Sequence, residues 1–231
     1  MNSEMNAQEK MKQTAGEYAV KFIQPGMIIG IGTGSTVYYF IKALGKKVAA
    51  GFEVKGVPTS RKTEELARQN GIALIDLNDV PLIDLAIDGA DEVDSNLQLI
   101  KGGGGSLLQE KMIAAASKQL IIIADAGKAV ERLGKFPLPI EVIPYGWKQT
   151  AKHIQQLNCN EIVLRQKEGN PFISDHGHYI LDCHFDKIDN AALLSQQLNA
   201  IPGVVENGLF INMASIAVFG NEDGTVRLAE K

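Results

Sequence analysis

Two aspartates, a lysine and a glutamate gather around a run of glycines near the middle of the chain. Asp88 ends the apolar run PLIDLAID, and Asp91 comes three residues later. Lys101 precedes a run of four glycines, and Glu110 comes in the first turns of an expected helix. Carboxylates, a cation and flexible backbone suit proton transfer beside a carbonyl group better than they suit packing. Glycines are costly in a loop without a purpose, because glycine loses more backbone entropy on folding than any other residue. The sequence therefore predicts an acid–base site that closes on a small anionic substrate.

Each of these residues also has an ordinary structural interpretation. The two aspartates could cap the turn after a strand, and the lysine could be solvated, as most lysines are. Glu110 could complement the dipole of a helix that Ser106 and Gln109 begin with an S-x-x-Q capping box. Together these interpretations explain poorly why all four residues flank one glycine run and two strand ends.

A second glycine motif, residues 30–36, reads GIGTGST. Glycines between a strand and a helix expose backbone N–H groups to an anion at the positive helix end. The match to a dinucleotide-binding G-x-G-x-x-G is poor, because Ser35 stands where the third glycine is expected and no acidic residue ends the next strand. A P-loop is also a poor match, since no G-K-[ST] follows. The hydroxyls of Ser35 and Thr36 favour a single phosphate, although a tight strand–helix turn would look similar.

The elements that position these residues alternate between strand and helix through the first half of the chain. Apolar runs predict strands at MIIGIG, FEVKGVP, IALIDL, DLAID and QLIIIADA, with helices between them. Repeated βα units predict an α/β fold with a mostly parallel, Rossmann-like sheet and helices on both faces. Ligands of such sheets bind beyond the carboxyl ends of the strands. The motifs GTGST, PTS and DGAD each follow a predicted strand, so we expect them to meet at one edge.

The pattern changes to α+β in the second half. We expect short strands at EIVLRQ, PFISD and YILDCHF, with Asp175-His176-Gly177 turning the last two into a hairpin. Helices are predicted at GWKQTAKHIQQLN and DNAALLSQQLNA, the second with Asp189 as N-cap. The strand-rich tail is expected to return to the first sheet. We therefore expect a Rossmann-like catalytic domain from residues 1–131 and 205–231, and a smaller α+β, ferredoxin-like domain from residues 132–204.

Composition excludes several classes of protein. The chain has 231 residues, a formal net charge of -4 and a pI of about 5.6, which argues against non-specific nucleic-acid binding. Its two cysteines, Cys159 and Cys183, are too few for a disulfide framework and favour a reducing compartment. The polar N-terminus lacks the apolar region of a signal peptide, and no apolar run approaches the roughly 20 residues that span a bilayer. A cytoplasmic protein without nucleic-acid or membrane partners is expected.

A histidine-containing segment raises the question of a metal. Strand alternation would place His176, His178, Asp182 and His184 on one side of a predicted hairpin. No paired C-x-x-C or H-x-x-x-H spacing accompanies them, and polar hairpin residues are usually solvated. We therefore expect no metal here.

Several motifs, in order over nearly the whole chain, resemble those of ribose-5-phosphate isomerase type A. They are Gln24-Pro25-Gly26, Thr33-Gly34-Ser35-Thr36, Asp88-Gly89-Ala90-Asp91, Lys101-Gly102-Gly103-Gly104, Glu110, Asp125-Ala126-Gly127-Lys128, Lys135-Phe136-Pro137-Leu138-Pro139 and Ala200-Ile201-Pro202-Gly203-Val204. The chain departs from several relatives at Gln109, where they have arginine, and at Gly127.

The resemblance implies an aldose–ketose isomerase of the pentose phosphate pathway that needs no metal or other cofactor. Such an enzyme is expected to interconvert ribose 5-phosphate and ribulose 5-phosphate, as a homodimer or homotetramer. Glu110 is the expected base that moves a proton between C2 and C1, Lys101 the oxyanion stabiliser, and Asp88 and Asp91 the groups that orient hydroxyls and help to open the sugar ring. The expected substrate-binding residues are Lys12, Thr33, Gly34, Ser35, Thr36, Asp88, Gly89, Ala90, Asp91, Lys101, Gly102, Gly103, Gly104 and Lys128, of which Lys12 and Lys128 rest mainly on the resemblance.

Two other functions are compatible with parts of the sequence. One is another enzyme on a related sheet, such as a sugar-phosphate deaminase or a coenzyme A transferase with a carboxylate nucleophile. The small expected phosphate site and the aspartate pair argue against the transferase. The other is a non-enzymatic sugar-phosphate sensor, which would be expected to carry a helix-turn-helix unit and would leave Glu110 without a role.

Overall fold

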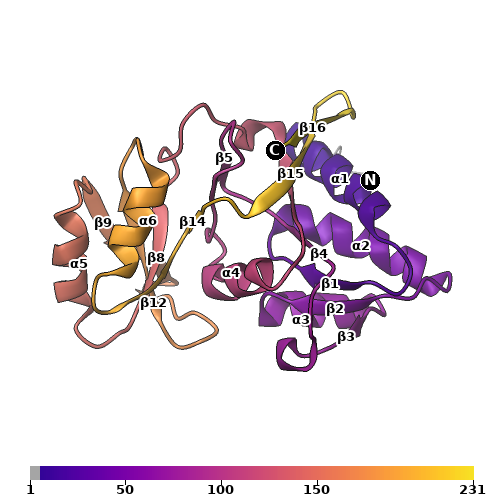
Figure 1. The fold of residues 1–231 in the computed structure, drawn as a ribbon, viewed down its shortest axis with the longest axis horizontal. Coiled ribbons are helices and arrows are strands. Elements are labelled where there is room, and N and C mark those ends of the chain that lie inside the picture. Colours follow the sequence, from indigo (N-terminus) through magenta and orange to yellow (C-terminus); the bar gives the residue numbers. More distant parts are fainter. Residues whose placement is uncertain (1–5) are drawn as a thin grey trace.

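The computed structural model describes residues 6–231 and contains a seven-stranded sheet (Figure 1). In spatial order its strands are β16 (Val226–Glu230), β15 (Ala214–Gly220), β7 (Leu120–Asp125), β4 (Leu85–Asp88), β1 (Ile28–Ile31), β2 (Lys55–Pro58) and β3 (Ala73–Leu74). All neighbours pair in parallel except β15 and β16, which form an antiparallel hairpin. The predicted mostly parallel sheet and the return of the tail to it are confirmed. We also expected no signal peptide at the N-terminus, but residues 1–5 of that segment lie outside the described residues.

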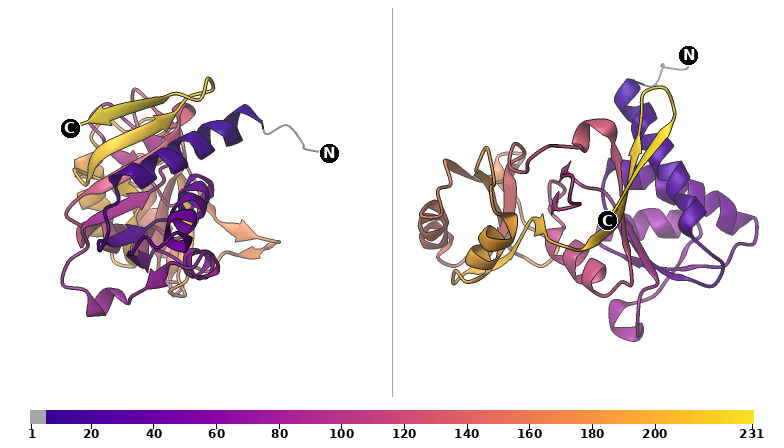
Figure 2. Two further views of the ribbon diagram at one scale, coloured as in Figure 1. Left: turned by 90° about the vertical axis from the view of Figure 1, so that its right-hand side faces the viewer. Right: turned by 45° about the horizontal axis from the view of Figure 1, so that its top comes forward.

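Helices cover both faces of this sheet, as Figures 1 and 2 show. They are α1 (Ala7–Ala19), the 3-10 turn η1 (Val20–Phe22), α2 (Ser35–Ala49), α3 (Arg61–Gln69) and α4 (Leu107–Ala115). The alternation of side chains along a strand divides the core between the faces. Ile121 and Ile123 of β7 belong to the cluster under α1, α2 and α3, whereas Ile122 belongs to the cluster under α4. Burial on both faces explains why β7 is apolar almost throughout.

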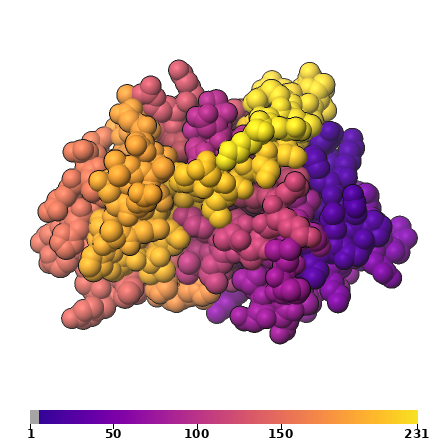
Figure 3. All heavy atoms as spheres, in the orientation of Figure 1, coloured from indigo at the N-terminus to yellow at the C-terminus, as the bar shows by residue number. Residues whose placement is uncertain are grey.

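A second, smaller lobe has its own hydrophobic core. Its four-stranded antiparallel sheet has the order β13 (Val204–Asn207), β8 (Leu138–Val142), β12 (Tyr179–His184) and β9 (Glu161–Leu164), covered by α5 (Trp147–Gln155) and α6 (Ala191–Asn199). We call these elements, with the hairpin β10 (Gln166–Lys167) and β11 (Asn170–Pro171), the α5–α6 lobe. It lies at the left of Figure 1, and the space-filling view shows it in continuous contact with the rest of the molecule (Figure 3).

Short elements complete the connection between the lobe and the seven-stranded sheet. A three-stranded antiparallel sheet has the order β14 (Leu209–Phe210), β6 (Leu99–Ile100) and β5 (Glu92–Val93). Two 3-10 turns are η2 (Leu77–Asp79) and η3 (Ala126–Lys128). Within residues 6–231, no helix is long and apolar enough to cross a bilayer.

Two expected strands are shorter than predicted, and one predicted helix cap is wrong. Of the segment PFISD only Pro171 lies in a strand, at the end of β11. Residues 172–174 form no strand, because Phe172 packs against Gly105 of the glycine loop, although the turn at residues 174–178 is present. The strand expected over IALIDL is short, Ala73–Leu74, since it lies at the sheet edge beside β2 alone. Helix α6 is capped by Asn190, whose side chain accepts from Leu193 N–H; Asp189 instead pairs with Arg132.

Candidate active site

The carboxyl ends of β1, β2 and β4 bring three predicted motifs together. Thr33 follows β1, and its hydroxyl oxygen lies 2.7 Å from that of Thr59 and 2.9 Å from that of Ser60, both of which follow β2. Thr33 N–H donates to a carboxylate oxygen of Asp88 at the end of β4, at 3.1 Å. The expected meeting of GTGST, PTS and DGAD at one sheet edge is confirmed.

Asp88 is buried where its carboxylate can be held by the backbone. Its Oδ1 accepts from Thr33 N–H and from Gly89 N–H, the latter at 2.7 Å. Gly32 makes room for it, because a Cβ atom there would lie 2.0 Å from Asp88 Oδ1. This close approach explains why the motif GIGTGST needs a glycine at position 32.

The centre of the site is a buried trio of Asp88, Lys101 and Glu110. Lys101 Nζ lies 3.0 Å from Asp88 Oδ2 and 3.3 Å from Glu110 Oε2, and it also donates to Gly89 O. All three side chains are almost completely shielded from solvent. Glu110 Oε2 faces the ammonium without an aligned hydrogen bond, and it has no hydrogen-bond partner among residues 6–231. Two carboxylates and one ammonium thus share a site from which water is largely excluded, with one carboxylate oxygen left open to a proton.

The ionisation of the trio is set by burial and by mutual charge. Burial, followed by the negative charge of Asp88, raises the pKa of Glu110 to about 8, against the opposing effect of Lys101. Burial also raises the pKa of Asp88 despite the neighbouring lysine. For Lys101 burial works in the opposite direction, but the two carboxylates outweigh it and raise its pKa. A carboxyl group with a pKa near neutrality can both take and return a proton during turnover.

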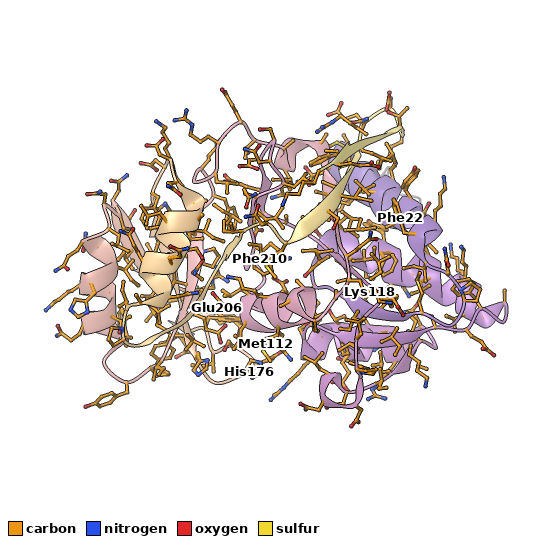
Figure 4. The ribbon with its side chains drawn as sticks, viewed as in Figure 1. Phe22, Met112, Lys118, His176, Glu206 and Phe210 are labelled. Atoms are coloured by element: carbon orange, nitrogen blue, oxygen red, sulfur yellow. The ribbon has the colours of Figure 1, made fainter. Side chains whose placement is uncertain are left out.

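Helix α4 presents Glu110 from its first turn. The predicted Ser106–Gln109 capping box is wrong: Ser106 makes no side-chain cap hydrogen bond, and Gln109 Oε1 is buried without a partner in the described part of the chain. Gln109 lines a different cavity, of about 430 Å³, to which Met112 and His176 also contribute (Figure 4).

The other face of α4 is tied to β13. Lys111 Nζ donates to Glu206 Oε1 at 2.8 Å and to Asn207 O at 2.6 Å, and Glu206 lies beside α4 in Figure 4. Packing and this ion pair, rather than a side-chain cap, therefore fix the helix that carries Glu110.

Asp91 and the glycine run form one wall of the site. Asp91 Oδ2 accepts from Gly103 N–H at 2.8 Å, and Asp91 N–H donates to Ile100 O. Gly102 has a φ of 102° and Gly105 a φ of 84°, so both need the conformational freedom of glycine. Glycine is therefore needed at position 102, at the edge of the cavity, because the backbone there has a positive φ.

The N-terminus of α2 provides a place for an anion. Gly34 precedes the helix with a φ of 126° and supplies no side-chain cap, so the first N–H groups are free of such a partner. Ser35 is exposed in the first turn, with Thr36 behind it. From α1, Lys12 lines the same cavity and pairs with Glu9 at 2.8 Å.

A cavity of about 170 Å³ collects the predicted residues. Its lining consists of Gln8, Lys12, Thr33, Gly34, Ser35, Thr36, Gly89, Ala90, Asp91, Lys101, Gly102, Gly103, Gly104, Glu110, Asp125 and Lys128. Asp88 does not line the cavity itself, and lies behind Lys101. Gln8 and Asp125 were not among the predicted site residues; Asp125 could have been found, because it ends the predicted fifth strand beside Lys128.

The histidine-containing segment is not arranged around a common centre. His178 Nδ1 lies 2.9 Å from Glu141 Oε1, whereas Asp182 pairs with Arg165. Within residues 6–231, no group of three or more histidine, cysteine or acidic side chains is placed to hold a metal ion.

Comparison with known proteins gives one consistent family. Residues 55–224 match the family model of ribose 5-phosphate isomerase A (phosphoriboisomerase A). The chain is 56% identical to the ribose-5-phosphate isomerase A of Bacillus mycoides over 215 residues, covering 93% of this chain and 97% of the relative.

Solved structures agree with the sequence comparison. A D-ribose-5-phosphate isomerase in complex with phospho-erythronic acid superposes with a TM-score of 0.94 at 43% identity, covering 98% of this chain and all of the other. The ribose 5-phosphate isomerase of Plasmodium falciparum has a TM-score of 0.93 at 36% identity, covering 96% and 99%. The chain therefore belongs to the ribose 5-phosphate isomerase A family of enzymes.

Proposed function

We propose that this enzyme interconverts D-ribose 5-phosphate and D-ribulose 5-phosphate by proton transfer through an enediolate, without a metal. The observation that carries the proposal is the buried contact of Glu110 with Lys101 at the wall of a small cavity. A solved relative binds phospho-erythronic acid, a four-carbon acid phosphate, which supports a sugar phosphate as ligand. Family membership and the raised pKa of Glu110 argue against the non-enzymatic sensor.

In the proposed reaction Glu110 removes the proton from C2 of the open-chain aldose. The electron pair shifts toward C1 and its oxygen, giving an enediolate whose charge Lys101 and the glycine-loop amides stabilise. Glu110 then returns the proton to C1, while the hydroxyl proton of O2 is transferred to O1, which gives the ketose. Asp91, which faces the cavity, orients the sugar hydroxyls directly. Asp88 acts from behind Lys101, since it holds the ammonium in place.

The proposal is tested by assaying ribose 5-phosphate conversion with purified enzyme in excess EDTA. We expect full activity, because two carboxylates and a lysine supply the acid–base and charge-stabilising groups. Loss of activity in the chelator, reversed by a divalent cation, would contradict the metal-free mechanism. Absence of turnover in every condition, although ribose 5-phosphate raises the melting temperature, would contradict the isomerase proposal itself.

The rate should depend on the protonation of Glu110. A base must be unprotonated, and kcat/KM reports the pKa of the free enzyme. Since burial raises that pKa to about 8, we expect kcat/KM to rise from pH 6 toward pH 9 and to level off above the pKa. A profile that is flat across this range in a set of overlapping buffers would refute the assignment.

We propose that the phosphate lies at the α2 N-terminus between Ser35, Thr36, Lys12 and Lys128. Lys128→Ala should raise the KM for ribose 5-phosphate by about 10- to 100-fold, the equivalent of about 1.5–3 kcal/mol for a charge-assisted hydrogen bond. The change in kcat should be small, because the phosphate does not react. Steady-state kinetics check this, with Lys135→Ala as control, since Lys135 is exposed in the same segment and does not line the cavity. Equal effects of both substitutions would contradict the phosphate site.

Three further proposals concern the domain boundaries, the cellular location and the assembly of this enzyme. We propose residues 1–131 and 208–231 as the catalytic domain and residues 132–207 as the smaller one. The second boundary differs from the expected 204/205, because β13 (Val204–Asn207) pairs with β8 of the lobe. A cytoplasmic location and a homodimeric or homotetrameric assembly agree with the composition and the resemblance.

A further inference from the structure

The glycine loop of the active site, residues 102–105, is held by an arginine of the α5–α6 lobe. Arg165 directly follows β9, and its Nη1 donates to Gly102 O at 2.8 Å and to Gly103 O at 3.1 Å. The arginine is more than 60 residues away along the chain, and its side chain is only 14% exposed. The loop is thus bridged by a guanidinium group that belongs to neither of its flanking elements.

Asp182 fixes the direction of this guanidinium. Arg165 Nε donates to Asp182 Oδ2 at 2.9 Å, and Nη2 donates to Oδ1 of the same carboxylate. A two-point arginine–carboxylate pair constrains the plane of the guanidinium as well as its position. Because Asp182 lies in β12, next to β9, the orientation of the arginine is set by the sheet of the lobe. Nη1 is left to point at the loop.

A phenylalanine supports the same loop at its other end. A Cβ atom on Gly105 would lie 2.4 Å from the ring of Phe172, so the ring packs directly against this glycine. Phe172 N–H donates to Arg165 O at 2.8 Å, and the guanidinium carbon lies 5.9 Å from the ring centroid. The arginine and the phenylalanine therefore form one surface of the lobe on which the loop rests.

This contact decides which way the loop amides face. A trans peptide is planar, so its C=O and N–H groups point in opposite directions. The carbonyl of Gly102 is turned toward Arg165, and the N–H of the same peptide, that of Gly103, donates to Asp91 Oδ2. The carbonyl of Gly103 is also turned toward Arg165, which directs the N–H of Gly104 away from the arginine. Gly104 itself lines the active-site cavity.

We propose that Arg165 is a positioning residue for the isomerisation, which holds the glycine loop so that the Gly104 N–H faces the developing oxyanion. The proposal rests on the function proposed above. Consecutive glycines have many accessible conformations, so their own sequence does not select this one. Arg165 selects it by binding two successive carbonyls, and Asp182 maintains Arg165 in the required orientation.

The test compares Arg165→Ala, Arg165→Lys and Asp182→Asn with the wild type. For Arg165→Ala we expect kcat to fall about 10- to 100-fold, because a loss of alignment of this size is typical of displacements near 1 Å, while KM changes little. Arg165→Lys should recover part of the loss, since an ammonium can reach a carbonyl but cannot form the two-point pair with Asp182. Arg132→Ala is the matched control, because Arg132 also pairs with an aspartate, Asp189, but lies outside the active-site cavity.

Binding measurements separate positioning from general damage to the fold. Phospho-erythronic acid has a carboxylate whose two oxygens share a charge, as O1 and O2 of the enediolate do, whereas inorganic phosphate lacks this group. Arg165→Ala should weaken binding of phospho-erythronic acid by a factor similar to the loss of kcat, and should leave the binding of inorganic phosphate unchanged. Circular dichroism at the assay temperature confirms that each variant is folded.

Three outcomes would overturn the proposal. They are an unchanged kcat in both Arg165→Ala and Asp182→Asn, an equal loss in Arg132→Ala, and an equal weakening of both ligands. An inactive wild type would instead refute the proposed isomerase function. The role of Arg165 is tested only by comparing its variants with an active wild type.

Discussion

Glu110→Gln is expected to reduce kcat for ribose 5-phosphate isomerisation by about 10²–10⁴, the range that a positioned general base contributes. Glutamine keeps the shape of the side chain but cannot accept and return the proton. Binding of substrate should be retained, because the phosphate contacts lie at the α2 N-terminus. The measurement is steady-state turnover, together with the shift in melting temperature that ribose 5-phosphate causes in each protein.

The matched control is Glu64→Gln, an isosteric change on the exposed surface of α3, where Glu64 pairs with Arg68 and does not line the active-site cavity. We expect its turnover to equal that of the wild type. Residual activity of Glu110→Gln within tenfold of the wild type would remove Glu110 as the base.

Glu110→Gln should also make the protein more stable than the wild type above neutral pH. The pKa of Glu110 is raised from 4.5 to about 8 in the folded protein. Between these values the folded state therefore binds more protons than the unfolded state, so the free energy of unfolding decreases as pH rises. Glu110→Gln removes this loss and leaves Lys101 paired with Asp88 alone. Its melting temperature should exceed that of the wild type at pH 9 by several degrees, since 1 kcal/mol corresponds to about 2–4 °C at this chain length, with a smaller difference near pH 5.

Lys101→Met should have the largest combined effect on stability and activity. It leaves the carboxylates of Asp88 and Glu110 buried without their cation, and breaking a buried ion pair in this way costs about 3–5 kcal/mol. Loss of a group that stabilises the developing oxyanion should also reduce kcat by about 10²–10³. Urea denaturation measures the first effect and turnover the second, both at a temperature where the variant is folded.

A double variant separates the two effects. Lys101→Met with Asp88→Asn removes one buried charge together with its partner, so much of the stability should return while activity stays low. If activity returned with stability, Lys101 would have a structural role only. If Lys101→Met alone were as stable as the wild type at pH 8, the ion pair would not hold the site together.

Local sequence patterns predicted most of the seven-stranded sheet. Its central strands are buried on both faces, so their sequences are nearly continuous apolar runs. The strand β7 is the clearest case, and it appears as expected at Leu120–Asp125. Predictions failed where neighbours overrode local signals. Ser106 and Gln109 match a capping box by type and spacing, yet the packing of α4 directs Gln109 into another cavity. The segment after Pro171 has the composition of a strand, but Phe172 packs on Gly105 instead.

The sequence by itself determined the inventory of the site and the edge of the sheet where it lies. Strand periodicity places Thr33, Ser60 and Asp88 at the ends of parallel strands, and these carboxyl ends lie at one edge of the sheet. The glycine run predicts an irregular loop. The tertiary structure alone decided the electrostatics and the direction of the loop. Burial of Glu110 beside Asp88 and Lys101 raises its pKa, and Arg165 reaches the glycine carbonyls from another sheet. Both depend on distances between residues far apart in the chain, and solvent exclusion and long-range contact leave no periodic signal in the sequence.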